Sequence, residues 1–357
     1  MAPSISLGSR GSLAPSSLLG RVLASRSKSE WPGSSRRSSL EPMPRLPAWV
    51  KVDLPGRGRY SDLRARLGHL HLNTVCEEAR CPNIAECWET GTATFMILGS
   101  VCTRGCRFCN VASGVRPSPP DPEEPRHVVE AVEALGLRYA VITSVDRDDL
   151  DDEGAGPWIS VLQTLRAELP QVTVEILTPD FSGRAELIDA VGRAGASVLG
   201  HNLETPRLQT PRVRDRRCDY DLSLDVLARY RALGSEILVK SGLMLGLGEG
   251  IGELRQALRD LRAVGVDWVT LGQYLRPSRK HVEVARYVPP EEFDDLATEA
   301  RELGFSLVTA GPLVRSSYRA AESGAIELIA RRRGLSLSRG AEDLAKASKI
   351  SVSSGLL

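Results

Sequence analysis

Six of the seven cysteines lie in two tight triplets, with the spacings C-x4-C-x5-C and C-x3-C-x2-C. The triplets consist of Cys76, Cys81, Cys87, Cys102, Cys106 and Cys109. Thiolates this closely spaced can converge on one inorganic core, and soft sulfur ligands suit iron–sulfur clusters. Two triplets therefore predict two clusters. Because each triplet offers three thiolates where four are usual, one iron of each cluster is left for another ligand.

Two other chemistries use clustered cysteines. A disulfide framework is typical of short secreted chains, whereas this chain has 357 residues and no convincing signal peptide. Structural zinc is the stronger alternative, and it would make the chain a zinc-stabilised binding module without catalysis. The nearby histidines, His69 and His71, precede the first triplet. Cys218 stands apart from both triplets and is expected to be an ordinary thiol.

The second triplet, with Phe108 directly before its last cysteine, resembles the signature of the radical S-adenosylmethionine (SAM) enzymes. The resemblance implies that these three cysteines hold a [4Fe-4S] cluster, whose open iron takes the amino and carboxylate groups of SAM. One electron then cleaves SAM and releases a 5′-deoxyadenosyl radical. A saturated C–H group has no acidic proton for a general base, so radical chemistry suits such a substrate.

The first triplet and several other segments narrow this resemblance to the lipoyl synthase family. The matching segments are residues 74–88, 91–99, 142–150, 201–204 and 311–318, the last of which ends in Arg-Ser-Ser-Tyr. The resemblance extends over about residues 44–322. The main rival is another radical SAM enzyme, such as a biotin-type sulfur inserter or a methylthiotransferase. The C-x4-C-x5-C run and the Arg-Ser-Ser-Tyr segment favour the lipoyl synthase family over that rival.

The resemblance implies a sulfurtransferase. Such an enzyme inserts two sulfur atoms, at C6 and C8 of an octanoyl chain that is amide-linked to a lysine of a carrier protein, and so forms the lipoyl group. The implied cofactors are SAM and two [4Fe-4S] clusters, of which the auxiliary cluster at the first triplet is the sulfur source. The cofactors carry the chemistry, so no side chain need act as a catalytic acid or base.

The implied partners are proteins that present the substrate or supply electrons and iron. They are octanoylated lipoyl-carrier domains (2-oxoacid dehydrogenase E2 subunits and the glycine cleavage H protein), an electron donor such as ferredoxin or flavodoxin, and an iron–sulfur cluster carrier. The formal net charge of +1 indicates no nucleic-acid partner. No apolar run approaches the length of a membrane span, so no membrane partner is expected.

Short apolar runs alternate with amphipathic stretches through the middle of the chain. The expected strands are residues 95–98, 139–143, 172–177, 197–200, 237–240 and 268–272, and the expected helices are 157–168, 183–194, 222–233 and 252–264. This alternation predicts parallel strands with right-handed crossovers. The resemblance implies an α/β fold, a partial (β/α)6 TIM barrel of the radical SAM type with N- and C-terminal extensions. Functional groups collect at the C-terminal strand ends of such barrels.

Polar and small residues near those strand ends are the expected SAM contacts. Ser144 and Asp146 follow the second strand and offer acceptors to the SAM ammonium group. Asn202 and Glu204 follow the fourth strand. The full expected set is Phe108, Ser144, Asp146, Asn202, Glu204, Lys240, Gly246, Tyr274 and Leu275. Polar turns, glycine turns and core packing are the structural alternatives at these positions.

The resemblance also implies a serine ligand for the auxiliary cluster, from the Arg-Ser-Ser-Tyr segment. We assign Ser317, with Ser316 as the alternative, because sequence does not separate adjacent hydroxyls. An alkoxide is a harder ligand than a thiolate, so its bond to iron should exchange more readily. Without the resemblance, a helix N-cap before Tyr318 would be the preferred interpretation.

The two ends of the chain differ in composition from its middle. The expected division is a disordered or targeting tail at 1–43, an extension with the auxiliary-cluster cysteines at 44–93, the barrel at 94–285, a C-terminal extension at 286–330 and a flexible tail at 331–357. Thiolate ligands indicate a reducing compartment. We therefore expect a cytoplasmic protein, with a mitochondrion or plastid as the alternative if residues 1–40, which are rich in Ser and Arg, are a transit peptide.

Overall fold

The computed structural model describes residues 46–50, 72–78, 81, 83, 84, 87, 93–318 and 324–334. The expected N-terminal tail and most of the expected C-terminal tail lie outside these residues. Within them, no helix is both long and apolar enough to cross a membrane.

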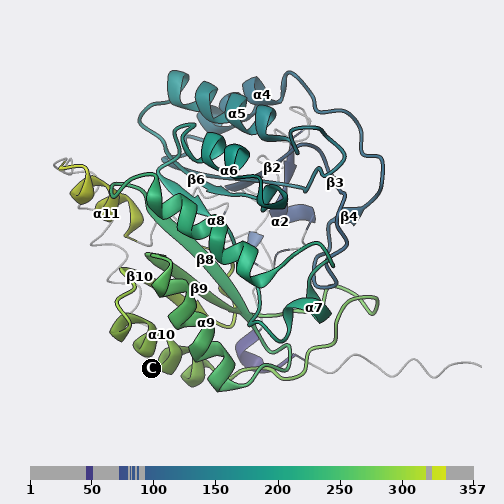
Figure 1. The fold of residues 1–357 in the computed structure, drawn as a ribbon, viewed down its shortest axis with the longest axis vertical. Helices are drawn as coiled ribbons and strands as arrows, with labels where there is room; N and C mark the ends of the chain where they lie inside the picture. Colours follow the sequence, from purple (N-terminus) through teal and green to yellow (C-terminus); the bar gives the residue numbers. More distant parts are fainter. Residues whose placement is uncertain are drawn as a thin grey trace, which may run out of the picture. The chain divides into compact units, whose positions relative to one another are not determined.

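One sheet of eight strands runs through the described chain (Figure 1). Seven strands are parallel, in the order β2-β5-β6-β7-β8-β9-β10, and β1 pairs antiparallel with β2. The strands are β1 (Asn73–Thr74), β2 (Ala93–Ile97), β5 (Tyr139–Ser144), β6 (Thr173–Leu177), β7 (Val198–Gly200), β8 (Leu238–Leu245), β9 (Trp268–Gln273) and β10 (Leu307–Gly311). β2 and β9 are buried along their whole length, as expected of parallel strands covered on both faces.

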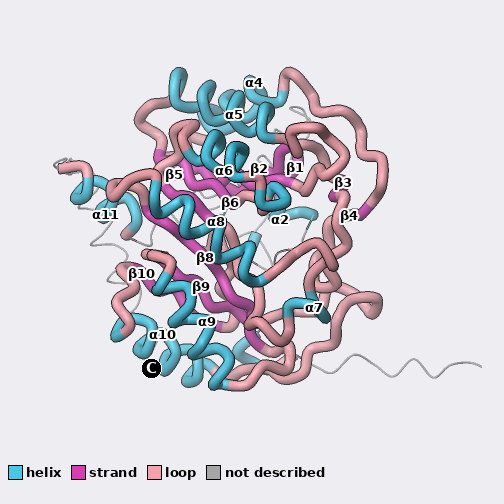
Figure 2. The backbone as a smooth tube through the Cα atoms, viewed as in Figure 1, coloured by secondary structure: helices cyan, strands magenta, loops and turns pink. Residues whose placement is uncertain are grey.

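A helix precedes every parallel strand after β2 (Figure 2). These helices are α4 (Glu124–Ala134), α5 (Ala155–Glu168), α6 (Ala185–Gly192), α8 (Tyr220–Ala232), α9 (Ile251–Ala263) and α10 (Pro290–Glu302). The remaining elements are η1 (Ala48–Val50), α2 (Val75–Glu78), β3 (Val101–Cys102), β4 (Ala112–Ser113), η2 (Phe181–Gly183), α7 (Thr210–Val213) and α11 (Ala325–Arg332). The repeated strand–helix unit brings the C-terminal strand ends to one edge of the sheet.

The predicted fold class, a partial parallel barrel, is confirmed. The structure adds one unit to the six expected, because α10 is followed by β10, which pairs parallel with β9. All five residues of β10 are only half-buried, unlike the fully buried residues of β2 and β9. No strand was expected at residues 307–311 from the sequence, although β10 extends the sheet parallel to β9.

The N-terminal ends of the strands are covered by α11. Ala325 and Ile329 of this helix pack against a group of buried residues at the strand starts, which includes Tyr139 and Trp268. Arg332, in the last turn of α11, donates to Asp267 (Nη2 to Oδ1, 2.7 Å) just before β9 begins. Residues 331 and 332, the first of the expected flexible tail, therefore belong to this helix, and residues 335–357 lie outside the described chain.

Lys240 belongs to this covered end. Its Nζ donates to Glu175 Oε1 (2.7 Å) and lies 3.5 Å from the centre of the Trp268 ring. The other Glu175 oxygen accepts from the Tyr139 hydroxyl (2.5 Å). Burial lowers the pKa of Lys240, while Glu175 opposes that shift. The expected SAM contact at Lys240 is therefore wrong: this side chain neutralises a buried carboxylate and is absent from the cavity lining described below.

The Lys240–Glu175 pair generates a stability prediction. Glu175→Gln leaves the Lys240 ammonium buried without a counter-charge, and we expect a loss of about 3 kcal/mol of unfolding free energy. Adding Lys240→Met removes the unpaired charge, so the double variant should recover most of that loss. Chemical denaturation of the wild type, both single variants and the double variant measures the coupling. Additive effects of the two substitutions would contradict the pairing.

Candidate functional site

A cavity of about 570 Å³ opens at the C-terminal ends of the parallel strands. Strand residues line its wall, among them Thr94 of β2, Ser144 of β5, Leu177 of β6 and Gly242 of β8. Five of the six triplet cysteines also line it: Cys76, Cys81, Cys102, Cys106 and Cys109. The sixth, Cys87, is buried in the adjoining core. Two triplets from separate segments of the chain therefore converge on one space.

The second triplet lies on the cysteine loop, which we define as residues 101–113 and which β3 and β4 close by parallel pairing. Arg104 anchors this loop and is 3% exposed. Its Nη1 and Nη2 both contact the Asp180 carboxylate at 2.7 Å, and its Nη2 also donates to Asp148 Oδ1 at 2.7 Å. These aspartates follow β6 and β5, so one guanidinium fixes the loop to two strand ends. Bidentate recognition of this kind is specific to arginine.

Cys102 and Asp146 meet at the base of the cysteine loop. The Cys102 thiol donates to Asp146 Oδ2 (3.4 Å) and accepts from the Asp146 backbone N–H (3.3 Å). Burial raises the pKa of Cys102 to about 12, and the Asp146 charge adds to this shift. Burial also raises the pKa of Asp146 to about 6, although Arg104 opposes it. Cys102 therefore keeps its proton near neutral pH, and a metal ligated there must displace it.

Cys106 has a neighbour that the sequence did not predict. Its thiol lies near the thiol of Cys218, close enough for the two to influence each other's ionisation, and Cys218 also lines the cavity. Arg104 Nη1 donates to Cys218 Sγ (3.6 Å), and the backbone N–H of Asp215 donates to Cys106 Sγ (3.2 Å). The expectation that Cys218 is an ordinary, separate thiol is therefore wrong. No spacing rule connects it to the triplet, because over a hundred residues separate it from Cys106.

The first triplet is tied to the C-terminal segment. Asn83, between Cys81 and Cys87, donates from Nδ2 to the Leu313 carbonyl (2.6 Å). Arg315 stands near Cys81, and its positive charge partly offsets the rise in the pKa of that thiol caused by burial. Arg315, Ser316 and Ser317 all line the cavity. The structure thus brings the two segments of the expected auxiliary site together, although the sequence separates them by more than two hundred residues.

Both serines of the Arg-Ser-Ser-Tyr segment face strand-end partners. Ser317 Oγ accepts from Thr94 Oγ1 (2.7 Å) on β2, and Ser316 Oγ accepts from Asn202 Nδ2 (2.7 Å) after β7. The residues that would continue a helix from here, 319–323, lie outside the described chain. The two hydroxyls therefore differ in their partners, and both reach the cavity.

Most of the expected SAM contacts lie together in the cavity lining. These are Phe108, Ser144, Asp146, Asn202, Glu204, Tyr274 and Leu275. Glu204 has a left-handed backbone (φ 66°) and bridges to Leu243 beyond the end of β7. A non-glycine residue in this conformation is strained, and such strain concentrates at functional sites. Phe108 and Tyr274 belong to an apolar group of side chains at one side of the cavity, which suits an aromatic ligand face.

Gly246 is not part of the cavity lining, and its glycine identity has a packing cause. It has a φ of +96°, and a Cβ there would collide with the Gln273 side chain and the Arg286 carbonyl. Its N–H donates to Glu249 Oε1 (2.6 Å). The expected SAM contact at Gly246 is therefore replaced by a structural role in the turn after β8.

His201 lies fully buried at the cavity wall and was not expected among the site residues. Its Nδ1 lies 2.9 Å from the Thr178 carbonyl, which can only accept, so Nδ1 carries the proton, and Nε2 lies 3.1 Å from Ser223 Oγ. Arg214 Nη1 also donates to Ser223 Oγ (2.8 Å). Burial, followed by the Arg214 charge, lowers the pKa of His201 to about 4. The imidazole is therefore neutral near pH 7 and positions the chain after β6.

The donor atoms in the cavity lining indicate which kind of metal group the site could hold. Among the described residues, no three His, Cys, Asp or Glu side chains are arranged to hold a single metal ion. A [4Fe-4S] cluster is different, because each thiolate binds a separate iron and the sulfur atoms stay apart. Three thiols on one short loop, facing a cavity with further polar acceptors, fit such a cluster better than they fit a lone zinc ion.

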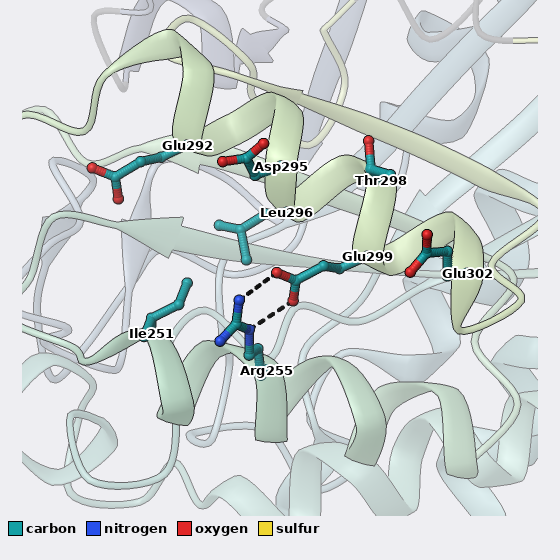
Figure 3. A pocket seen from close by; sticks show the side chains of 8 residues that line it. All are labelled: Ile251, Arg255, Glu292, Asp295, Leu296, Thr298, Glu299 and Glu302. Atoms are coloured by element: carbon teal, nitrogen blue, oxygen red, sulfur yellow. Dashed lines mark hydrogen bonds and ion pairs between the residues drawn. The ribbon is translucent and has the colours of Figure 1, made fainter.

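A second hollow, of about 410 Å³, lies between α9 and α10 (Figure 3). Its lining includes Arg255, Glu292 and Glu302, and Arg255 pairs with Glu299 at 2.6 Å across it. The figure shows the Arg255 side chain of α9 directed toward Glu299 of α10. No thiol belongs to its lining, and it is separate from the residues discussed above.

Two stretches of the chain match known families. Residues 96–261 match the radical SAM superfamily, and residues 18–81 match the N-terminal domain of lipoyl synthase of the radical SAM family. The second match begins upstream of residue 44, where the sequence motifs placed the start of the resemblance. Together with the parallel partial barrel and its cysteine-lined cavity, these matches define a radical SAM enzyme.

Full-length relatives specify the family. Lipoyl synthase of Anaeromyxobacter sp. (strain Fw109-5) is 55% identical over 278 residues, 78% of this chain and 94% of the relative. Mitochondrial lipoyl synthase of Lachancea thermotolerans is 47% identical over 307 residues, 85% of this chain and 82% of the relative. A solved structure of methylornithine synthase aligns with a TM-score of 0.43 at 16% identity, over 81% of this chain and 96% of that one. The chain belongs to the lipoyl synthase family.

Because Arg104 is buried and holds the cysteine loop, its substitution should destabilise the protein more than substitution of an exposed arginine does. Arg104→Lys keeps the charge but loses the bidentate pair with buried Asp180, so we expect a loss of about 3 kcal/mol of unfolding free energy. Iron bound after anaerobic reconstitution should also fall, because the cysteine loop is no longer fixed. Arg126→Lys, at an exposed pair with Glu123, is the matched control and should cost less than about 0.5 kcal/mol. Equal effects of the two substitutions would contradict the anchor.

The neutral His201 predicts a pH dependence of stability. Its folded-state pKa of about 4 lies below the ordinary value of 6.5, so the unfolded chain binds the proton first as the pH falls. His201 should therefore lower the unfolding free energy by up to about 3 kcal/mol between pH 6.5 and pH 4, with no effect above pH 7. Denaturation of the wild type and of His201→Asn across this range isolates the contribution. Parallel pH profiles of the two proteins would exclude it.

Proposed function

We propose that this chain is a lipoyl synthase, which inserts sulfur at C6 and C8 of an octanoyl chain carried on a protein lysine. The observation that carries the proposal is the single cavity that both cysteine triplets line, at the C-terminal ends of a parallel barrel. Sulfur insertion at an unactivated carbon needs a radical source and a sulfur source close to the same substrate. Two iron–sulfur sites on one cavity would meet that requirement.

The residues divide between two cofactor sites. Cys102, Cys106 and Cys109 would hold the [4Fe-4S] cluster that binds SAM, and Cys76, Cys81, Cys87 and Ser317 would hold the auxiliary cluster. When bound, these groups supply the radical that removes hydrogen and the sulfur that replaces it. Thr94 would orient the Ser317 hydroxyl through their hydrogen bond, and Arg315 would favour the charged form of Cys81.

The rest of the lining would orient SAM and the acyl chain. Asp146, Ser144, Asn202 and Glu204 offer acceptors at the strand ends, where the ammonium and ribose groups of SAM need them. Phe108, Tyr274 and Leu275 offer an apolar surface for the adenine. Met96, Val141, Leu243 and Met244 add an apolar wall that suits an octanoyl chain and excludes water from a reactive radical. In this arrangement no side chain needs to move a proton.

The proposed reaction needs partner proteins that present the substrate, supply electrons and replace the consumed sulfur. An octanoyl lysine presented by a lipoyl-carrier domain, such as an E2 subunit or the glycine cleavage H protein, would enter the open cavity. A ferredoxin or flavodoxin would supply electrons, and an iron–sulfur cluster carrier would replace the sulfur consumed. We propose a cytoplasmic location. Mitochondrial relatives exist, so N-terminal sequencing of the native protein is the test, with cleavage near residue 43 as the organellar outcome.

Exchange of cysteines in one triplet at a time tests the division of labour. Cys106→Ala, or loss of the whole second triplet, should abolish SAM cleavage, because no cluster iron remains to bind SAM. Loss of the first triplet should leave 5′-deoxyadenosine formation measurable but stop sulfur insertion. Iron and sulfide per chain, measured after anaerobic reconstitution, should fall by about half in each case, since each [4Fe-4S] site has its own ligands.

Ser317→Ala and Ser316→Ala form a matched pair within the same experiment. Loss of the Ser317 hydroxyl should alter the Mössbauer spectrum of the auxiliary cluster and reduce lipoyl formation, while three thiolates retain part of the iron. Ser316→Ala should spare the spectrum. Normal spectra and turnover in both variants would refute a serine ligand, and 5′-deoxyadenosine made without the second triplet would refute the proposed function.

A further inference from the structure

Cys218 lies inside the site of the second triplet, although it belongs to a different part of the chain. A short turn holds it there. Asp215 Oδ2 accepts from the Gly105 N–H (2.8 Å), and the Asp215 N–H donates to Cys106 Sγ (3.2 Å). The Cys218 N–H then donates to the Asp215 carbonyl (2.9 Å). These bonds dock the turn onto the cysteine loop and fix the position of Cys218 beside Cys106.

The two side chains lie side by side at the cavity. The Asp215 turn joins them, because its N–H contacts Cys106 Sγ and its carbonyl accepts from the Cys218 N–H, and both cysteines are free thiols in the structure. Arg104 Nη1 donates to Cys218 Sγ (3.6 Å) and helps to hold that sulfur in place. Both side chains are half-buried and line an open cavity, so a small reagent can reach them. A disulfide between them requires the two sulfur atoms to approach to about 2.05 Å, with the turn at Asp215 already holding the side chains next to each other.

The C-x3-C-x2-C run supplies three ligands without Cys218, so the fourth thiol needs another explanation. A thiol that has lost its metal can be oxidised to sulfinic acid, which is not reversed, whereas a disulfide is reversible. A second cysteine placed beside an oxidisable one can trap it as a disulfide. We propose that Cys106 and Cys218 form a reversible disulfide when the second triplet carries no cluster. This disulfide protects Cys106 and blocks cluster loading until it is reduced.

The oxidant is a low-molecular-weight disulfide such as oxidised glutathione. One protein thiol attacks it, so the reagent S–S bond breaks, a mixed disulfide forms and one glutathione thiol leaves. The second protein thiol then attacks the mixed disulfide and releases the second glutathione thiol. In total the protein loses two electrons and two protons, and the reagent gains them. The linkage is independent of the proposed function, and only its effect on cluster loading rests on that function.

The full chain, freed of iron by a chelator and then exposed to oxidised glutathione, tests this proposal. Trypsin cuts after Arg104, Arg107 and Arg217, so Cys106 is released in the tripeptide 105–107 and Cys218 in the peptide 218–229. Cys102 and Cys109 fall in other peptides, so mass spectrometry without reduction identifies each linkage. We expect the 105–107 peptide joined to the 218–229 peptide as the main product, and its disappearance after dithiothreitol.

Two variants and one state of the protein are the controls. Cys218→Ser should abolish the linkage and leave glutathione on Cys106 as a mixed disulfide. Cys109→Ser, in the same loop, should keep the linkage. Iron-loaded protein should resist the reaction, and oxidised wild type should bind iron only after reduction. A main product that joins Cys106 to Cys102 or Cys109, or that leaves Cys106 reduced, would overturn the proposal; iron binding that is unaffected by the disulfide would overturn the gating alone.

Discussion

The buried guanidinium of Arg104 is the interaction on which the site depends. The Arg104 residue is 3% exposed, and burying its charge is costly unless the charge is paired and hydrogen bonded. Asp148 and Asp180 supply both the opposite charge and the hydrogen-bond acceptors. The two aspartates lie just beyond neighbouring parallel strands, where the fold brings strand ends together. Since Arg104 sits between Cys102 and Cys106, the same interaction that satisfies its charge fixes the position of the cysteines. The ends of two barrel strands therefore determine where the cysteine loop lies.

The second constraint is the closure of the cavity by segments distant in sequence. The first triplet precedes β2, and the Arg-Ser-Ser-Tyr segment follows β10, the last parallel strand. Asn83 bonds to the Leu313 carbonyl, Thr94 to Ser317 and Asn202 to Ser316, so both ends of the barrel sequence meet at the same opening. This meeting places the first triplet next to the cysteine loop, where Asn110 Nδ2 donates to the Glu78 carbonyl (2.7 Å). A substrate between them would face both sites without leaving the cavity, as two successive sulfur insertions require.

The opposite end of the barrel has a separate role. Lys240, Glu175 and Tyr139 form a buried polar group at the strand starts, with α11 packed over them. In barrels of parallel strands the N-terminal end supports stability and the C-terminal end supports chemistry. That division explains why Lys240, which looks like a cofactor contact in the sequence, has a structural partner instead. The Lys240 side chain belongs to the buried group at the strand starts and is absent from the cavity lining.

The sequence by itself determined the cysteine spacing, the alternation of strands and helices and the motifs of the lipoyl synthase family. These patterns involve residues close together in the chain, so they can be recognised without knowledge of the fold. Tertiary structure decided which distant groups meet: Cys218 beside Cys106, Arg315 beside Cys81, and Lys240 with Glu175. The tertiary structure also showed why residue 246 is a glycine. Gln273 and Arg286 pack so closely against the turn that a Cβ at this position would collide with them. Contacts across 65 or more residues, as these are, depend on the whole fold, which no spacing between neighbours encodes.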